Sequence, residues 1–142
     1  VGRETNDNMS SFLSKLFIEK MKERKLGKKI LILGLSFKED VSDIRNSKIF
    51  DMIEYFHKKK YEVDVFDPLS KINKNQIKNF NFFQSTNFKH KYDGIFIAVG
   101  HQKFINIGIK KIKSFGKKRC LFFDFKNIFL HDVSHNSSFV KL

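Results

Sequence analysis

Four short runs of apolar residues, set apart by longer helical or polar stretches, constrain the fold of this chain most strongly. They lie at residues 29–33, 62–66, 94–100 and 120–124. The runs are nearly continuous, which is typical of strands that are covered on both faces. Strands that alternate with helices in this way predict a parallel sheet. We therefore expect an α/β fold, a Rossmann-like parallel sheet with flanking helices, preceded by one long helix.

The expected helices follow from apolar residues at three- and four-residue steps. Residues 6–25 form the first, with an apolar stripe made of Met9, Phe12, Leu13, Leu16, Phe17 and Met21. Residues 46–59 form the second, with Ile49, Phe50, Ile53 and Phe56 on one side. Residues 104–115 form a third, with Ile105, Ile109 and Ile112 facing inward. The polar stretch 71–87 has room for a short helix and a short strand.

The first helix, about 30 Å long at 1.5 Å per residue, fits two roles equally well. In the first role it links two domains or forms a dimer seam. In the second it packs on its own domain. We expect residues 1–27 to be a connecting or dimerisation helix and residues 28–142 to be one ligand-binding domain, because 142 residues suffice for about one domain. The first residue is Val, which suggests that the chain starts inside a longer protein.

Composition excludes several classes of protein. No apolar run approaches the ~20 residues that span a bilayer, so we expect no membrane partner. The one cysteine, Cys120, cannot form an internal disulfide and lies in an apolar run. This favours a buried strand residue in a protein of the reducing cytoplasm. No cluster of His, Cys and carboxylates has metal-ligand spacing, so no metal site is predicted.

The formal charge of +13 suggests an anionic ligand or a nucleic acid. Four of the 28 basic residues are arginine and the rest are lysine, although arginine is the residue suited to bidentate base and phosphate recognition. Background drift toward lysine is the favoured explanation of the positive charge, and a patch that attracts anionic ligands is the other explanation. A non-catalytic, basic nucleotide- or nucleic-acid-binding module stays an alternative, but no recognisable nucleic-acid module supports it.

Ligands of parallel α/β sheets bind outside the carboxyl ends of the strands, which directs attention to the loops there. The loop after the first strand holds a single glycine, Gly34, and so lacks the G-x-G-x-x-G cradle of a dinucleotide site. It carries Phe37, which can stack on a base, and Lys38 and Arg45, which can hold phosphate or ribose oxygens. A solvated charged loop with Phe37 packed in the core is an equal alternative.

Three further residues follow the other strands. Asp67 can hold a ribose hydroxyl, as in true Rossmann sites, but capping the next segment is the favoured role. His101 is a candidate base or ligand contact, although a loop histidine is more often structural or solvated. Lys126, after the last strand, faces the same crevice as Lys38 if the predicted sheet is right.

The motifs at these strand ends resemble one known family. The sequence GLSFK at 34–38, with Arg45 and Ser47 behind it, is similar to the opening of the C-terminal domain of UDP-glucose/GDP-mannose dehydrogenases. VFDP at 65–68, AVGH at 98–101 and DFKN at 124–127 resemble three further motifs of that family, in the same order. Residues 2–9 resemble its connecting helix.

This resemblance implies an NAD-dependent oxidation of the C6 alcohol of a nucleotide sugar to a carboxylate. It implies that Phe37, Lys38 and Lys126 contact the UDP-sugar and that Arg45 reaches the NAD. A lysine at 126 favours a UDP-N-acetylhexosamine as substrate, for a surface polysaccharide precursor. The family's N-terminal NAD-binding domain and catalytic cysteine have no counterpart in the 142 residues. We therefore expect no catalytic residue here, an inactive chain on its own, that domain as partner, and a homodimer through the first helix.

Overall fold

The computed structural model describes residues 2–35, 48–72, 75, 77–88, 90–125 and 128, with residues 2–10 described as backbone alone. Its elements, in chain order, are α1 (Gly2–Glu23), β1 (Lys29–Leu33), α2 (Ile49–Lys58), β2 (Glu62–Phe66), β3 (Asn81–Phe83), β4 (Tyr92–Ile97), α3 (Gln102–Ile107), α4 (Ile109–Ser114) and β5 (Gly116–Asp124). The predicted strands at 29–33 and 62–66 are confirmed residue for residue.

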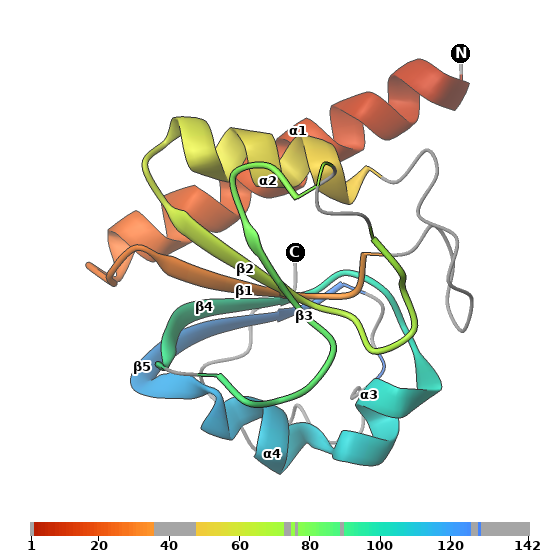
Figure 1. Ribbon diagram of the computed structural model, residues 1–142. Helices are drawn as coiled ribbons and strands as arrows, with labels where there is room; N and C mark the ends of the chain where they lie inside the picture. Colours follow the sequence, from red (N-terminus) through yellow and green to blue (C-terminus); the bar gives the residue numbers. More distant parts are fainter. Residues whose placement is uncertain are drawn as a thin grey trace.

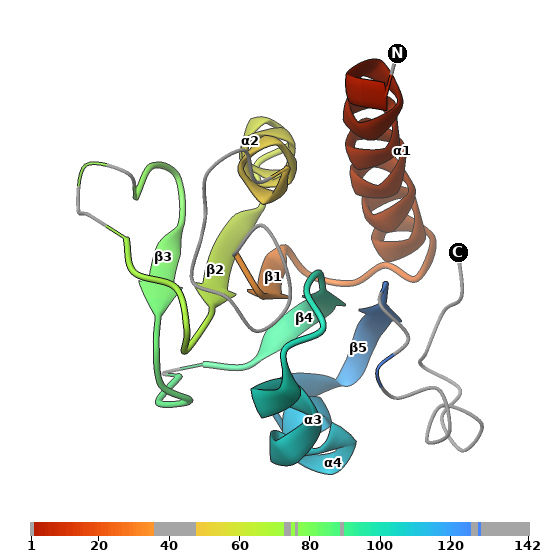
Figure 2. The same cartoon turned by 90° about the vertical axis from the view of Figure 1, so that its right-hand side faces the viewer.

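The five strands form one sheet in the order β3-β2-β1-β4-β5, and every neighbouring pair is parallel. β1 lies at the centre, where Leu31 is paired with Asp64 of β2 on one side and with Ile95 of β4 on the other. Figure 2 shows the five strands side by side, twisted as parallel sheets are. The predicted α/β fold with a parallel sheet is confirmed.

Helices cover both faces of this sheet, which explains why β1 is apolar at successive positions. Ile30 and Ile32 point into a core shared with α1 and α2, whereas Leu31 and Leu33 point into a second core with α3 and α4. Figure 1 shows α1 and α2 on one side of the strands and α3 and α4 on the other. Alternate side chains of a strand leave on opposite faces, so a strand between two helical layers needs apolar residues at every position.

The C-terminal part of α1 packs on the sheet, as one of the two alternatives for this helix predicts. The ring of Phe17 meets that of Phe96 edge to face, with centroids 5.4 Å apart. Gly94 of β4 lies under the helix, where a Cβ atom would come within 2.9 Å of the Phe17 ring. A side chain at position 94 would therefore push α1 off the sheet.

The stripe predicted for α1 is partly wrong. Leu13, Phe17 and Met21 are buried, as expected, but Phe12 is 60% exposed and Leu16 is half-buried. Ile18, which the stripe omits, is buried instead. The line of contact with the sheet runs along one side of the predicted stripe, so Phe12 faces outward.

The region from 92 to 124 corrects four further expectations. The single helix predicted at 104–115 is two short helices, α3 and α4, because Gly108 between them takes a φ of +89°. Ile105 is exposed rather than inward, and Phe104 is buried in its place. β5 begins at Gly116, four residues earlier than predicted, and β4 covers Tyr92–Ile97 rather than 94–100. The early part of β5 has exposed residues at 117–119, and their polarity hides this part of the strand from a search for apolar runs.

None of the helices in the described ranges is long and apolar enough to cross a membrane.

Candidate functional site at the carboxyl ends of the strands

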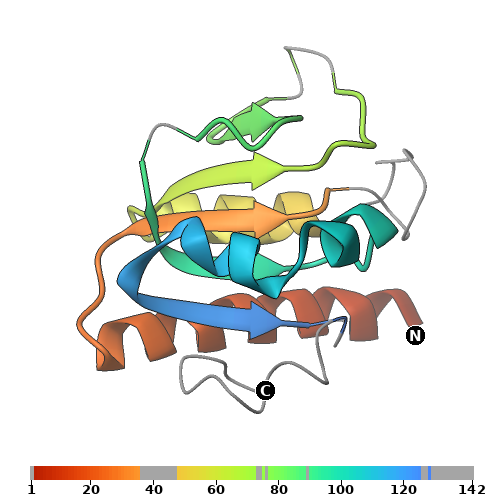
Figure 3. The ribbon, with the colours of Figure 1, turned by 90° about the horizontal axis from the view of Figure 1, so that it is seen from below.

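All five strands end on one edge of the sheet, and the predicted ligand-binding residues belong to the loops at this edge. Figure 3 shows the strand arrows pointing in the same direction, with the N-terminal end of α1 on the same side. Phe37, Lys38, Arg45 and Lys126 themselves lie outside the described residues, so their roles stay predictions. The described part of the edge shows what holds the starts of their loops.

Asp67, directly after β2, is the centre of this edge. Its side chain is completely buried. One carboxylate oxygen, Oδ2, accepts hydrogen bonds from the backbone N–H of Leu35 at 2.8 Å and from the Ser70 hydroxyl at 2.8 Å, and it lies 3.1 Å from Nε2 of His101. The other, Oδ1, accepts from the N–H groups of Leu69 and Ser70 at 2.9 and 3.1 Å. One carboxylate thus joins the ends of β1, β2 and β4.

The surroundings of Asp67 favour its ionised form. Burial by itself raises the pKa of this carboxyl. The hydrogen bonds from His101, Leu35 and Ser70, together with the charge of a protonated His101, outweigh burial and lower the pKa from 3.8 to about 2. Hydrogen bonds donated to a carboxylate stabilise the charged state, which is why a buried acid stays ionised here. Asp67 is therefore a fixed negative charge under the loops.

This geometry decides between the two roles expected for Asp67. The bonds from Leu69 and Ser70 cap the turn that follows β2, as the favoured alternative predicts. A ribose hydroxyl would need an exposed carboxylate oxygen, and Asp67 has no exposed surface. His101, likewise fully buried, is structural rather than a solvated loop residue. Its ring also stacks at a tilt on Phe104, with centroids 5.2 Å apart.

The end of β1 is packed tightly against the end of β4. Gly34 has a φ of +104°, and a Cβ there would come within 2.6 Å of the Val99 side chain. Its N–H donates to the carbonyl of Phe66 at 2.9 Å, and the Leu33 carbonyl accepts from Ala98 at 2.9 Å. Only glycine fits this position without strain. The glycine therefore serves the packing of two strand ends.

The end of β5 is anchored in a similar way. Asp124 is buried, and its Oδ1 accepts a hydrogen bond from the backbone N–H of Ile128 at 3.1 Å. The N–H of Phe125 donates to the carbonyl of Ile97 at 3.2 Å. These bonds hold Phe125 and Ile128, the described residues on either side of positions 126 and 127. The start of this turn lies beside the end of β4, because β4 and β5 are neighbours.

Cys120 is not a nucleophile. It is buried in β5, and burial, assisted by the negative charge of Asp93, raises the pKa of its thiol to about 12. A reactive cysteine needs the thiolate at neutral pH. The prediction of a buried strand cysteine is confirmed. In the described part of the chain, no group of three or more His, Cys, Asp or Glu could hold a metal ion.

Comparison with known proteins identifies the family. Residues 31–131 match the family model for the UDP binding domain of the UDP-glucose/GDP-mannose dehydrogenase family. This chain belongs to that dehydrogenase family. The matched range contains β2 to β5, the last three residues of β1 and all four loop ends described above, so the resemblance seen in the sequence motifs is confirmed.

Individual relatives of the dehydrogenase family point the same way. The chain is 35% identical over 132 residues to a UDP-N-acetyl-D-glucosamine 6-dehydrogenase of Salmonella typhi, covering 89% of this chain and 31% of that protein. It is 31% identical over 137 residues to the protein of the same name from Pseudomonas aeruginosa, covering 94% and 32%. The chain thus spans about a third of the length of these relatives.

A solved dehydrogenase structure supports the fold. The NDP-N-acetyl-D-galactosaminuronic acid dehydrogenase of Methanosarcina mazei Go1 superposes with a TM-score of 0.76, covering 97% of this chain and 29% of that one. Its sequence is 23% identical, so this likeness shows the fold alone.

The sequence pattern missed the pairing of Asp67 with His101. Both were singled out as strand-end residues, but they are 34 positions apart and nothing in the sequence joins them. The signal was indirect: in the dehydrogenase fold β2 and β4 both flank β1, so the residues that follow them converge.

Proposed function

We propose that this chain is the nucleotide-sugar-binding portion of an NAD-dependent UDP-sugar 6-dehydrogenase. The full enzyme would oxidise the C6 alcohol of a UDP-N-acetylhexosamine to the uronic acid, for a surface polysaccharide precursor. The observation that carries the proposal is the match of residues 31–131 to a UDP binding domain. The names of the Salmonella and Pseudomonas relatives support an N-acetylhexosamine as the sugar.

In this proposal Phe37, Lys38 and Lys126 contact the UDP-sugar. What supports it is the anchoring of their loops. Leu35, two residues before Phe37, is held by the Asp67 carboxylate, and the residues on both sides of Lys126 are held by Asp124 and Ile97. Loops that start from fixed points at one edge lose less conformational entropy when a ligand orders them.

NAD would act as the hydride acceptor, and the described residues do not fit it. Gly34 is the single glycine where a dinucleotide cradle needs three. The acid after β2, Asp67, is buried and cannot hold a ribose. We therefore propose that NAD is bound mainly by an N-terminal domain of the same enzyme, with Arg45 reaching toward it, and no step of hydride transfer is assigned to this sheet.

The same reasoning extends to activity and assembly. The one cysteine of the chain is buried with a raised thiol pKa, so the chain alone should not turn over substrate. A homodimer through residues 1–27 is supported by Phe12, which α1 leaves 60% exposed while its other side packs on the sheet. We place the protein in the cytoplasm, since its lone cysteine needs no oxidising compartment.

Isothermal titration calorimetry with UDP tests the proposed site. Lys38→Ala should weaken UDP binding by about 1.5–3 kcal/mol, the value of a hydrogen bond to a charged group. Lys118→Ala removes the same charge from an exposed position at the opposite edge of the sheet and should leave the affinity nearly unchanged. Equal losses in both variants would mean that net charge, rather than a site, attracts the nucleotide.

A further inference from the structure

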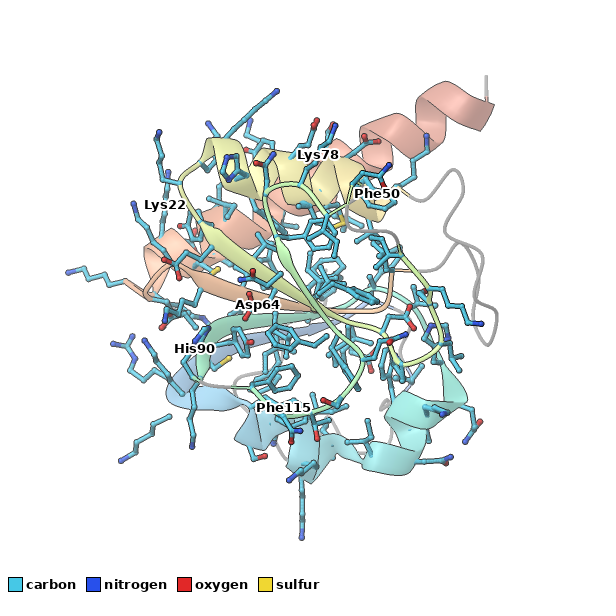
Figure 4. All side chains as sticks on the ribbon, viewed as in Figure 1. Lys22, Phe50, Asp64, Lys78, His90 and Phe115 are labelled. Carbon is cyan, nitrogen blue, oxygen red and sulfur yellow. The ribbon has the colours of Figure 1, made fainter. Side chains whose placement is uncertain are left out.

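The amino ends of the five strands lie opposite the proposed UDP site, and the parallel topology gathers distant segments of the chain there. Residues 22–29 lead into β1, residues 57–62 into β2 and residues 90–93 into β4, and residues 116–119 are the first four residues of β5. We call these four segments together the basic edge. Figure 4 shows Lys22 and His90, from the first and third segments, on this side of the molecule.

The basic edge carries a large share of the charge of the protein. Its 22 residues hold 12 of the 28 lysines and arginines, against three carboxylates, and the net charge of the whole chain is +13. One of those carboxylates, Asp93, is buried. The described segments at the carboxyl edge, residues 34–35, 67–72, 98–103 and 124–125, hold two lysines and two aspartates. Among the described residues, cations are therefore denser at the basic edge than at the carboxyl edge.

The acids of the basic edge neutralise few of its cations. Asp93 accepts a hydrogen bond from the backbone of Lys29 and pairs with Lys117 at 3.1 Å. Glu62 reaches Lys29 only at 3.9 Å. Within the described part of the chain, Lys25, Lys60 and Lys118 make no ion pair of 4.0 Å or less. Exposed cations crowded together repel one another, and an anionic partner would relieve that repulsion.

A groove opens beside Lys60, one of these cations. It has a volume of about 590 Å³, and the basic and acidic residues that line it, among those described, are one lysine (Lys60), two histidines (His57 and His90) and two acids (Glu62 and Asp64). Its floor is rigid, because the Asp64 carboxylate accepts hydrogen bonds from the Tyr92 hydroxyl at 2.5 Å and the Asn81 amide at 2.9 Å. His90 lies 3.4 Å from the same carboxylate. The groove thus offers a fixed concave surface with amide and imidazole groups, in which the Asp64 carboxylate already has partners and Lys60 is the one lysine of the described lining.

We propose that the basic edge is a docking surface for an acidic polypeptide segment of a protein partner, whose backbone lies along this groove and whose carboxylates face the exposed lysines outside it. The groove suits an extended backbone, which needs hydrogen-bonding groups, whereas a membrane surface is flat. Ten of the twelve cations are lysine, and lysine lacks the planar fork that holds nucleic-acid phosphates and bases in pairs. The aromatic rings at the edge, Tyr61 and Tyr92, are 5% and 1% exposed, so they offer no stacking platform to unpaired bases.

Fluorescence anisotropy on the 142-residue chain tests the proposal. The probe is a labelled peptide of about twelve residues that alternates Glu and Gly. The triple variant of Lys58→Gln, Lys60→Gln and Lys118→Gln removes three exposed cations of the basic edge. It should weaken peptide binding roughly ten-fold, the sum of three solvent-exposed ion pairs. Added salt should weaken binding to the native chain, because exposed charges are screened.

A matched control removes the same charge elsewhere: Lys71→Gln, Lys103→Gln and Lys110→Gln, which are exposed and outside the basic edge. This control should bind the peptide nearly as the native chain does. Circular dichroism melts check that both variants fold, and amide shifts of Asn81 and His90 on peptide addition report the groove without any substitution. An equal loss in both triple variants, or no peptide binding at low salt, overturns the proposal. Tighter binding to a DNA duplex or to phosphatidylserine vesicles than to the peptide overturns the choice of partner.

Discussion

The Asp67 carboxylate should account for a measurable part of the acid sensitivity of the fold. The perturbation is Asp67→Asn, which keeps the shape of the side chain and removes its charge. The pKa of this carboxyl falls from 3.8 to about 2 on folding. A group whose pKa is lowered by folding stabilises the folded state above its unfolded pKa, and that stability is lost as the pH falls toward the folded pKa.

The size of the effect follows from the two pKa values. A shift from 3.8 to about 2 corresponds to about 2 kcal/mol of stability at neutral pH. About half of this should already be lost between pH 5 and pH 3, because the unfolded carboxyl takes up a proton over this range while the folded one stays largely ionised. The replacement also has a cost independent of pH, since an amide nitrogen would face the N–H donors of Leu35 or of Leu69 and Ser70.

Urea unfolding at a series of pH values, followed by circular dichroism, measures the effect. The quantity of interest is the difference in unfolding free energy between the native chain and Asp67→Asn, plotted from pH 5 to pH 3. It should shrink by about 1 kcal/mol over that range. Asp51→Asn removes the same charge from an exposed position on α2 and should show a much smaller change. A difference for Asp67→Asn that is flat with pH would refute the account of this carboxyl as a fixed buried charge.

Two further predictions concern the core. Cys120 should not react with a thiol reagent in the native protein, because burial raises its thiol pKa to about 12; it should react at once in guanidinium chloride, and native reactivity would contradict its place in β5. Phe17→Ala should cost about 3–5 kcal/mol of unfolding free energy, as expected for a buried aromatic ring. Phe12→Ala should cost about 0.5 kcal/mol or less, because the Phe12 side chain is exposed. If sedimentation shows a dimer, Phe12→Ala should weaken it; a dimer of unchanged affinity would argue against the α1 seam.

Strands were predicted well where both faces are covered. At residues 29–33 every position must be apolar to satisfy two cores, so the sequence pattern marks the strand and its limits. β5 shows the converse. Residues 117–119 are exposed before the strand passes under α1, so their polarity hides the first part of the strand. The break at Gly108 was missed for a different reason: apolar spacing reports a helical face and says little about a single left-handed residue.

The sequence predicted where the candidate ligand site lies in the fold, but it did not predict the contacts between the residues at that edge. Ligand chemistry at the carboxyl ends of the strands follows from the fold class, and the residues that follow the strands could be named from sequence. The contact of Asp67 with His101 could not, because burial and distance depend on how three loops pack together. The gathering of lysines at the opposite edge was equally hidden, since its segments are far apart until the strand order is known.

The central claim is that this chain binds the nucleotide sugar and leaves NAD to another domain. Parallel calorimetric titrations of the same preparation, one with UDP and one with NAD, test it most directly. Binding of UDP at millimolar nucleotide or below, with no heat from NAD over the same range, is the predicted result. Binding of NAD without UDP, or of neither nucleotide, would contradict it.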